Sequence, residues 1–178
     1  MEKTGKILEN DQILLRKPEP EDLEFLFSLE NNPDFWFFSD TRTPFSKWQI
    51  KQHIENTVYD IFTNKELRLI IEQKANKNPV GIIDLFEFDP IHHRAGVGIL
   101  INKNSQNNHI ASQALSLIID YCFRILDLHQ IWCNIDAENQ ISINLFVSKG
   151  FKQCGNLTDW KKNKTTYSDV RVFQLINN

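Results

Sequence analysis

The chain has few of the residues on which several common types of site depend. Only six of its 178 residues are glycine, and neither a Walker-type phosphate loop nor a Gly-x-Ser-x-Gly elbow occurs. Gly96-x-Gly98 begins like a dinucleotide fingerprint, but Ile101 stands where the third glycine belongs. These absences exclude P-loop nucleotide chemistry, the α/β-hydrolase triad and a Rossmann-type dinucleotide site.

Cysteine is also scarce. Cys122, Cys133 and Cys154 lie far apart and form no Cys-x-x-Cys pair, and an odd number fits reduced thiols in a cytoplasmic protein. Cys133 has no histidine paired with it in the sequence, so we expect a buried thiol and no nucleophile there. The five histidines have no metal-ligand spacing, and no metal site is expected.

Long apolar runs and an excess of positive charge are absent as well. No stretch of about 18 apolar residues occurs, and residues 1–6 are polar, so we expect neither a membrane span nor a signal peptide. The net charge is −3, from 20 basic and 23 acidic side chains, and provides no basic field for nucleic acid. This mild acidic excess tolerates a cationic substrate.

The order of hydrophobic periodicities predicts one mixed α/β (α+β) domain over residues 1–178. An antiparallel meander of three strands precedes a strand–helix–strand crossover, which points to a mixed and mostly antiparallel sheet. The expected strands cover 13–15, 67–71, 80–88, 95–101, 131–135, a strand beginning at 151, and 170–176, and the expected helices cover 20–31, 46–62 with Ser46 as its cap, 108–126, and 139–150.

Two segments carry most of the functional information. The first runs from the strand 96–101 through a polar loop into a helix that opens at Asn108. The first N–H groups of a helix have no partner within the helix and lie at its positive end, so they form an anion site. In the second segment, 139–151, Asn139 begins a short helix that ends at Gly150.

These segments resemble the GNAT superfamily of acetyl-CoA-dependent N-acetyltransferases. The family's phosphate-loop pattern, Gln/Arg-x-x-Gly-x-Gly/Ala, aligns with residues 106–111. Its second pattern, an asparagine before a short helix with an aromatic residue and a final Gly-Phe, aligns with Asn139, Phe146 and 150–151. The stretch 80–95 looks most like the polyamine (spermidine or diamine) branch and its ribosomal-protein N-terminal acetylating relatives.

The resemblance implies a GNAT-like fold in which the strands 97–101 and 131–135 are parallel and splayed. The pantetheine of acetyl-CoA would enter this V and pair with the first strand, and the pyrophosphate would sit on the amides of 107–112. A backbone N–H near Leu100 or Ile101 would stabilise the oxyanion. The implied acetyl-CoA-binding residues are Ile99, Leu100, Ile101, Gln106, Asn107, Asn108, His109, Ile110, Ala111, Ser112, Asn139, Asn144, Phe146 and Lys149.

The acceptor implied by the resemblance is a primary amine of a polyamine-like small molecule or of a protein N-terminus. Alternation places Asp84 with Phe86 and Phe88 on one face of the strand, and Glu87 with Asp89 on the other. One of these carboxylates then faces the cleft, and we choose Glu87 as the catalytic base. The alternative is a solvated sheet edge without a catalytic role.

Two residues depart from the family pattern and keep a second function open. His109 stands where the family has its first glycine, and its β-carbon narrows the approach to phosphate. Phe146 stands where many relatives have a tyrosine that protonates the leaving thiolate, and phenylalanine has no proton to give. Phe146 is either a core residue or a pantetheine contact, and the chain is either the enzyme or an acyl-CoA-binding sensor or interaction module without turnover.

Two further features of the sequence allow more than one interpretation. The aromatic segment 36–38 either lines the substrate mouth or pins the first helices to the sheet. The aromatic excess and the expected strand edges also suit a homodimer.

Overall fold

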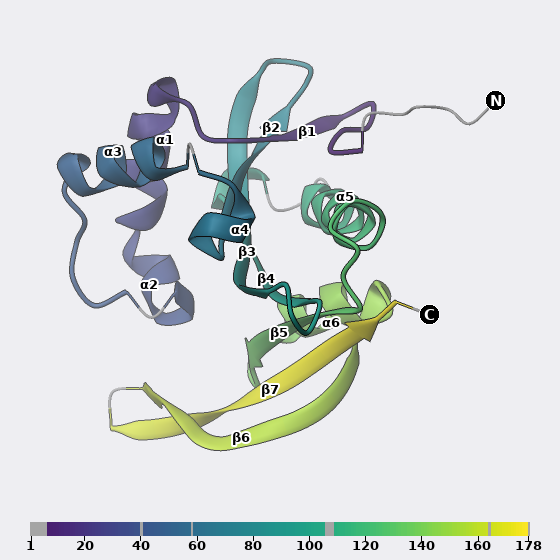
Figure 1. The fold of residues 1–178 in the computed structure, drawn as a ribbon. Helices are drawn as coiled ribbons and strands as arrows, with labels where there is room; N and C mark the ends of the chain where they lie inside the picture. Colours follow the sequence, from purple (N-terminus) through teal and green to yellow (C-terminus); the bar gives the residue numbers. More distant parts are fainter. Residues whose placement is uncertain (1–6, 40, 58, 106–108, 164, 178) are drawn as a thin grey trace.

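The protein is built on a seven-stranded sheet with helices on both sides (Figure 1). The computed structural model describes residues 7–39, 41–57, 59–105, 109–163 and 165–177. The strand order is β1-β2-β3-β4-β5-β7-β6, and β4 and β5 form the parallel pair, as the sequence predicts. The strands are β1 (Ile13–Arg16), β2 (Leu67–Gln73), β3 (Asn78–Asp89), β4 (Arg94–Ile101), β5 (Gln130–Asp136), β6 (Lys152–Asn163) and β7 (Thr166–Ile176).

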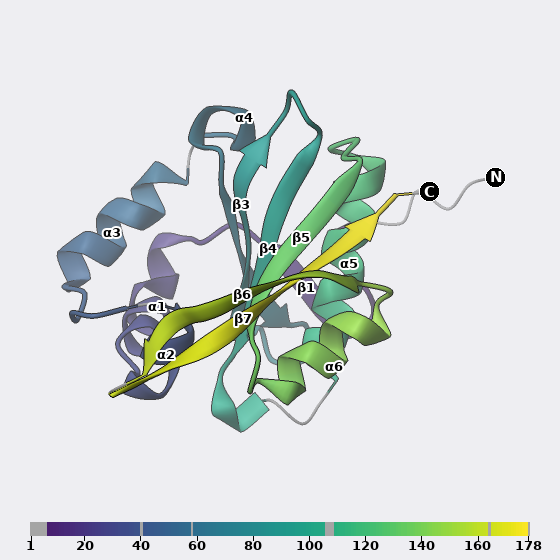
Figure 2. The same ribbon diagram turned by 90° about the horizontal axis from the view of Figure 1, so that it is seen from below.

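Figures 1 and 2 show α1, α2 and α3 on one side of the sheet and α5 and α6 on the other. The long hairpin of β6 and β7 forms the end of the sheet next to β5 and runs at an angle to the other strands. The helices are α1 (Leu23–Glu30), α2 (Pro33–Ser39), α3 (Lys47–Asn56), α4 (Ile61–Asn64), α5 (Ile110–Arg124) and α6 (Gln140–Ser148), with short 3₁₀ helices at η1 (Pro20–Asp22) and η2 (Lys103–Ser105).

Each side of the sheet has its own apolar core, because neighbouring residues of a strand point to opposite faces. On β3, Ile83 packs in the cluster that contains Ala114 and Ile118 of α5. The neighbouring Ile82 packs with Leu26 of α1 and Ile50 of α3. The two cores hold the helices of both sides against the strands that carry the site.

The helix predicted over 46–62 is two helices, and this prediction is wrong in its length. Ser46 caps α3 as predicted, accepting a hydrogen bond from the backbone N–H of Gln49 at 3.2 Å, but α3 ends at Asn56. Asp60 then caps the separate helix α4 by accepting from the N–H of Thr63 at 2.9 Å. Aspartate is a strong N-cap, so a new helix begins there.

The aromatic segment 36–38 lies in α2, a helix that the sequence analysis did not predict. The indole N–H of Trp36 donates to the carbonyl of Glu30 at 2.9 Å, which ties α2 to the end of α1. The contact joins two helices to each other, so both predicted roles of Trp36 stay predictions, and the side chains of Phe37 and Phe38 lie outside the described residues.

The predicted alternation along β3 is wrong beyond Phe86. The pairing of β3 with β4 shifts register between Phe86 and Asp89, and Glu87 has a φ of 48°. This β-bulge adds a residue to one strand and reverses the faces that follow. Phe88 therefore packs with Leu85 against the α5 side, while Phe86 remains on the α1–α3 side with Asp84.

Candidate functional site

β4 and β5 pair over only three residues before they separate. The last pair is Gly96 with Trp132. β4 continues to Ile101 and β5 to Asp136 without pairing with each other, while β5 pairs with β7 along its other edge over its whole length. Among the described residues, no strand pairs with the β5-facing edge of β4 from Val97 onward. The strands are thus parallel and splayed, as predicted, and an extended ligand could pair with this edge of β4 over residues 97–100.

Two aromatic rings close the V where the strands meet. The rings of Phe86 and Trp132 pack edge to face, with centroids 5.2 Å apart and an interplanar angle of 83°. A Cβ added to Gly96 would lie 2.3 Å from the Phe86 ring, so glycine is what lets the ring rest on the backbone of β4. Leu100 and Ile101, where we predict the oxyanion donor, lie toward the open end.

The first predicted binding segment lies at the open end of the V. Gln106, Asn107 and Asn108 lie outside the described residues. His109 is the N-cap of α5 in a left-handed conformation, with φ 54° and ψ 13°. Ala111 and Ser112 fall in the first turn of α5, where backbone N–H groups have no partner within the helix. The left-handed conformation at His109 explains why a glycine suits this position of the pattern.

His109→Gly is expected to raise the stability of the protein by about 1 kcal/mol, because a left-handed conformation costs an L-residue roughly 1–2 kcal/mol. Part of that gain is offset by the greater freedom of glycine in the unfolded chain. The change also removes the Cβ from the helix N-terminus, so CoA is expected to bind more tightly. Thermal melts and calorimetry with CoA measure the two effects.

Lys77→Gly is the matched control, because Lys77 is exposed in a turn at a φ of 56°. It should raise the melting temperature similarly and leave the affinity for CoA unchanged. An equal change of CoA affinity in both variants would contradict a role of His109 at the cofactor.

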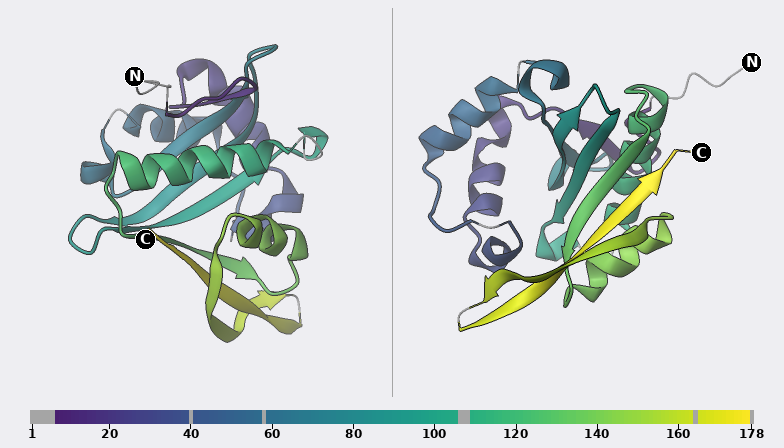
Figure 3. Two further views of the ribbon diagram at one scale, coloured as in Figure 1. Left: turned by 90° about the vertical axis from the view of Figure 1, so that its right-hand side faces the viewer. Right: turned by 60° about the horizontal axis from the view of Figure 1, so that its bottom comes forward.

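The second predicted segment forms α6, which packs beside the start of α5. Asn139 caps α6, accepting from the N–H of Ser142 at 3.1 Å, and Lys149 is the C-cap. Asn144 is exposed and accepts a hydrogen bond from the side chain of Gln140 at 2.7 Å. Figures 2 and 3 show α6 next to the N-terminal end of α5.

Phe146 faces inward from α6 and is only 3% exposed. Its ring packs edge to face with Phe151, with centroids 5.0 Å apart. Phe146 shares a core cluster with Ile110, the first residue of α5, and with Ile101 at the end of β4. The structure thus brings α6, α5 and β4 together, and acetyl-CoA binding by these residues stays a prediction.

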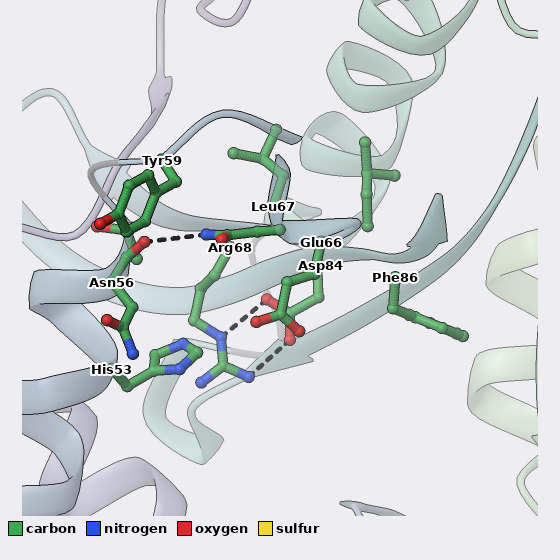
Figure 4. A pocket seen from close by; sticks show the side chains of 11 residues that line it. His53, Asn56, Tyr59, Glu66, Leu67, Arg68, Asp84 and Phe86 are labelled. Atoms are coloured by element: carbon green, nitrogen blue, oxygen red, sulfur yellow. Dashed lines mark hydrogen bonds and ion pairs between the residues drawn. The ribbon is translucent and has the colours of Figure 1, made fainter. Parts of the chain in front are cut away.

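A pocket opens on the other face of the sheet, between it and α1 and α3. Its volume is about 570 Å³, and a smaller hollow of about 100 Å³ shares four of its residues (Figure 4). The shared residues are His53 of α3, Arg68 of β2, and Asp84 and Phe86 of β3. Because Phe86 also covers Gly96, the pocket reaches the closed end of the V.

An ion cluster lies in this pocket. The guanidinium of Arg68 donates to both carboxylate oxygens of Asp84, at 2.9 and 2.8 Å, and to the carboxylate of Glu30. Burial disfavours the charged guanidinium, but the two carboxylates outweigh it and raise the pKa of Arg68 above its ordinary value. Burial first, and then the charge of Arg68, lower the pKa of His53. At neutral pH this imidazole is therefore uncharged.

Sequence reasoning missed His53 and Arg68 because no local motif contains them. The one available signal was the helical spacing of α3, where His53 stands beside the buried Ile50 and Ile54 and so faces the sheet. Glu87, the predicted base, is exposed at the bulge next to Phe86, and its catalytic role stays a prediction.

Buried thiols and possible metal ligands add no further site to the described part of the chain. Cys133 is buried, as predicted, and burial raises its pKa, as it raises the pKa of Cys122 to about 12. Within the described residues, no group of three or more His, Cys, Asp and Glu side chains is arranged to hold a metal ion. No helix among these residues is long and apolar enough to cross a membrane.

A splayed parallel strand pair, with a helix N-terminus at its open end and a pocket at its closed end, is the arrangement of an acyl-CoA-dependent transferase. The acetyltransferase (GNAT) domain family matches residues 12–152, and the chain belongs to this family. The protein is therefore an N-acetyltransferase that uses acetyl-CoA. Membership favours the enzyme over the sensor without turnover that the sequence left open.

Several relatives share most of the chain. A spermidine N(1)-acetyltransferase of Vibrio cholerae is 30% identical over 170 residues, 94% of each chain. The Escherichia coli spermidine N(1)-acetyltransferase is 28% identical over 82% of this chain and 75% of its own. A crystal structure of the Vibrio cholerae spermidine N-acetyltransferase with CoA and spermine has a TM-score of 0.83 at 28% identity, covering 94% of this chain and 96% of that one.

Proposed function

We propose that the protein acetylates a primary amine of a polyamine of the spermidine type, with acetyl-CoA as the donor. The observation that carries this substrate class is the pocket at the closed end of the V. Glu30 and Asp84 set two carboxylates against the single guanidinium of Arg68, which leaves one net negative charge beside a neutral His53. Such a pocket attracts a cationic amine, and the names of the relatives support the same class.

On the donor side, we propose that acetyl-CoA lies along β4 at 99–101. Its phosphates meet residues 106–112, and Asn139, Asn144, Phe146 and Lys149 flank it from α6. The amine enters from the pocket and its nitrogen attacks the thioester carbon beside β4, where a backbone N–H near Leu100 or Ile101 stabilises the oxyanion. The cytoplasmic location and the homodimer expected from the sequence belong to the same proposal.

Steady-state acetylation, followed by release of the CoA thiol, tests the substrate class. Spermidine, spermine, peptides with a free N-terminus and an aminoglycoside are compared at equal concentration. The polyamines are expected to give the highest kcat/KM. Binding of CoA by calorimetry without thiol release from any polyamine would overturn the polyamine assignment.

Ala111→Pro is expected to weaken CoA binding by roughly ten- to a hundredfold. Proline removes the N–H of the second residue of α5, and a hydrogen bond to a charged group contributes about 1.5–3 kcal/mol. The first turn of a helix tolerates proline, so the fold should persist, and calorimetry with CoA measures the loss. Trp48→Pro, the same change at the second residue of α3, should leave CoA affinity unchanged, and equal losses in both variants would remove Ala111 from the phosphate site.

A further inference from the structure

The acceptor pocket contains a buried imidazole that the acetyl transfer outlined above does not use. The Nε2 atom of His53 is buried and has no hydrogen-bond partner within the described part of the chain. A buried polar atom without a partner is rare in native proteins and points to a function or to a missing ligand. His53 therefore carries an unused hydrogen-bonding position in the wall of the pocket.

Four charged groups act on the imidazole of His53. Arg68 of β2 lowers the pKa of the imidazole together with burial, whereas Glu66, Asp84 and Glu30 act in the opposite direction with smaller effects. Figure 4 shows the guanidinium of Arg68 between His53 and Asp84. Because burial and Arg68 outweigh the three carboxylates, the imidazole of His53 is uncharged at neutral pH and can accept a proton.

The neighbouring carboxylates are less suited to this task. Both oxygens of Asp84 accept hydrogen bonds from Arg68, and the carboxylate of Glu30 accepts a third. Glu87 is exposed to solvent at the bulge, and an exposed carboxylate is a weak base toward an ammonium ion.

We propose that His53 is the general base that takes a proton from the acceptor ammonium ion. The proposal rests on the proposed function, since it needs a cationic amine in this pocket. One proton passes from the ammonium to Nε2 of His53, directly or through one water. The freed electron pair of nitrogen forms the bond to the acyl carbon, the carbon–sulfur bond breaks, and the CoA thiolate takes the second amine proton. His53 then returns its proton to water.

The pH dependence of kcat/KM for spermidine, in wild type and His53→Gln, tests this role. Burial lowers the pKa of His53, so in the wild type kcat/KM should fall only at a pH below the ordinary pKa of histidine and be flat between there and the pKa of the amine. In His53→Gln, only amine already deprotonated in solution reacts. Its kcat/KM should be about 10²–10⁴-fold lower at pH 7 and rise about tenfold per pH unit.

His129→Gln is the control, because it removes an exposed imidazole directly before β5 that lines neither hollow of the acceptor pocket, and it should keep the wild-type profile. His53→Asn repeats the test with a shorter side chain, and thermal melts of both variants identify a loss of fold. Glu87→Gln tests the competing base in parallel.

The outcomes separate the two proposals. A wild type without turnover of any polyamine would overturn the proposed function, and the base role with it. A wild type that turns over polyamine, with a His53→Gln variant reduced by the same factor at every pH, would overturn the base role alone. If Glu87→Gln shows the rising pH profile expected for His53→Gln, and His53→Gln keeps the wild-type profile, the general base is Glu87.

Discussion

Gly81→Ala is expected to destabilise the protein by about 3 kcal/mol. A Cβ at Gly81 would lie 2.4 Å from the carbonyl oxygen of Leu100 and 2.8 Å from the Cδ1 atom of Ile101. Overpacking costs about 1–3 kcal/mol, and here the obstacle includes the backbone of a paired strand, which cannot rotate away. For a domain of this size the melting temperature should fall by about 6–12 °C.

The same substitution should also raise KM for acetyl-CoA, because Leu100 and Ile101 form the open end of β4 along which we propose the donor lies. Gly155→Ala is the matched control, since its Cβ would meet Val172 at 3.6 Å, an ordinary contact. Chemical denaturation and steady-state kinetics measure both effects. Equal stability of the two variants would show that β3 and β4 approach each other less closely than the structure indicates.

The parts of the fold that follow from local pattern were predictable. The apolar stripe of α5 recurs at helical spacing, and its buried members include Ile110, Ala114 and Ile118. A helix of that length between two strands is the usual connection of a parallel pair, so the parallel β4 and β5 followed from the order of elements. Gly150, which the sequence predicts as the end of the helix, follows the C-cap Lys149 of α6 and has a φ of 89°.

The errors arise where one backbone torsion or one cap outweighs periodicity. Strand alternation assumes an unbroken ladder, and the left-handed residue Glu87 adds a position that moves Phe88 to the opposite face. Hydrophobic spacing alone continued a helix to 62, whereas the cap at Asp60 starts a new one. Both signals involve a single residue and do not appear in a periodic pattern.

The acceptor pocket was out of reach for a different reason. His53, Arg68 and Asp84 come from a helix and two strands, and they meet only because Arg68 and Asp84 face the same side of paired strands under α3. No spacing rule joins them. The cofactor segments, by contrast, each lie in one continuous stretch of chain, and a resemblance can detect such stretches.

Phe146→Tyr is expected to raise kcat by up to about 100-fold, the usual range of general-acid catalysis. The family pattern that residues 139–151 resemble implies a tyrosine at this position, whose hydroxyl would protonate the leaving thiolate. Phe146 shares its core cluster with Ile101 of β4 and Ile135 of β5, the two strands that splay. A hydroxyl on this ring should reach the thioester sulfur and gain a hydrogen-bond partner there.

Phe151→Tyr separates this effect from a change of packing. Phe151 is the edge-to-face partner of Phe146 and is 2% exposed, so its new hydroxyl is buried without a partner and costs about 1–3 kcal/mol. We expect a lower melting temperature and no faster turnover for Phe151→Tyr, and faster turnover at a nearly unchanged melting temperature for Phe146→Tyr. If Phe146→Tyr instead behaves like Phe151→Tyr, the ring is a core residue alone, and the leaving thiolate takes its proton from water.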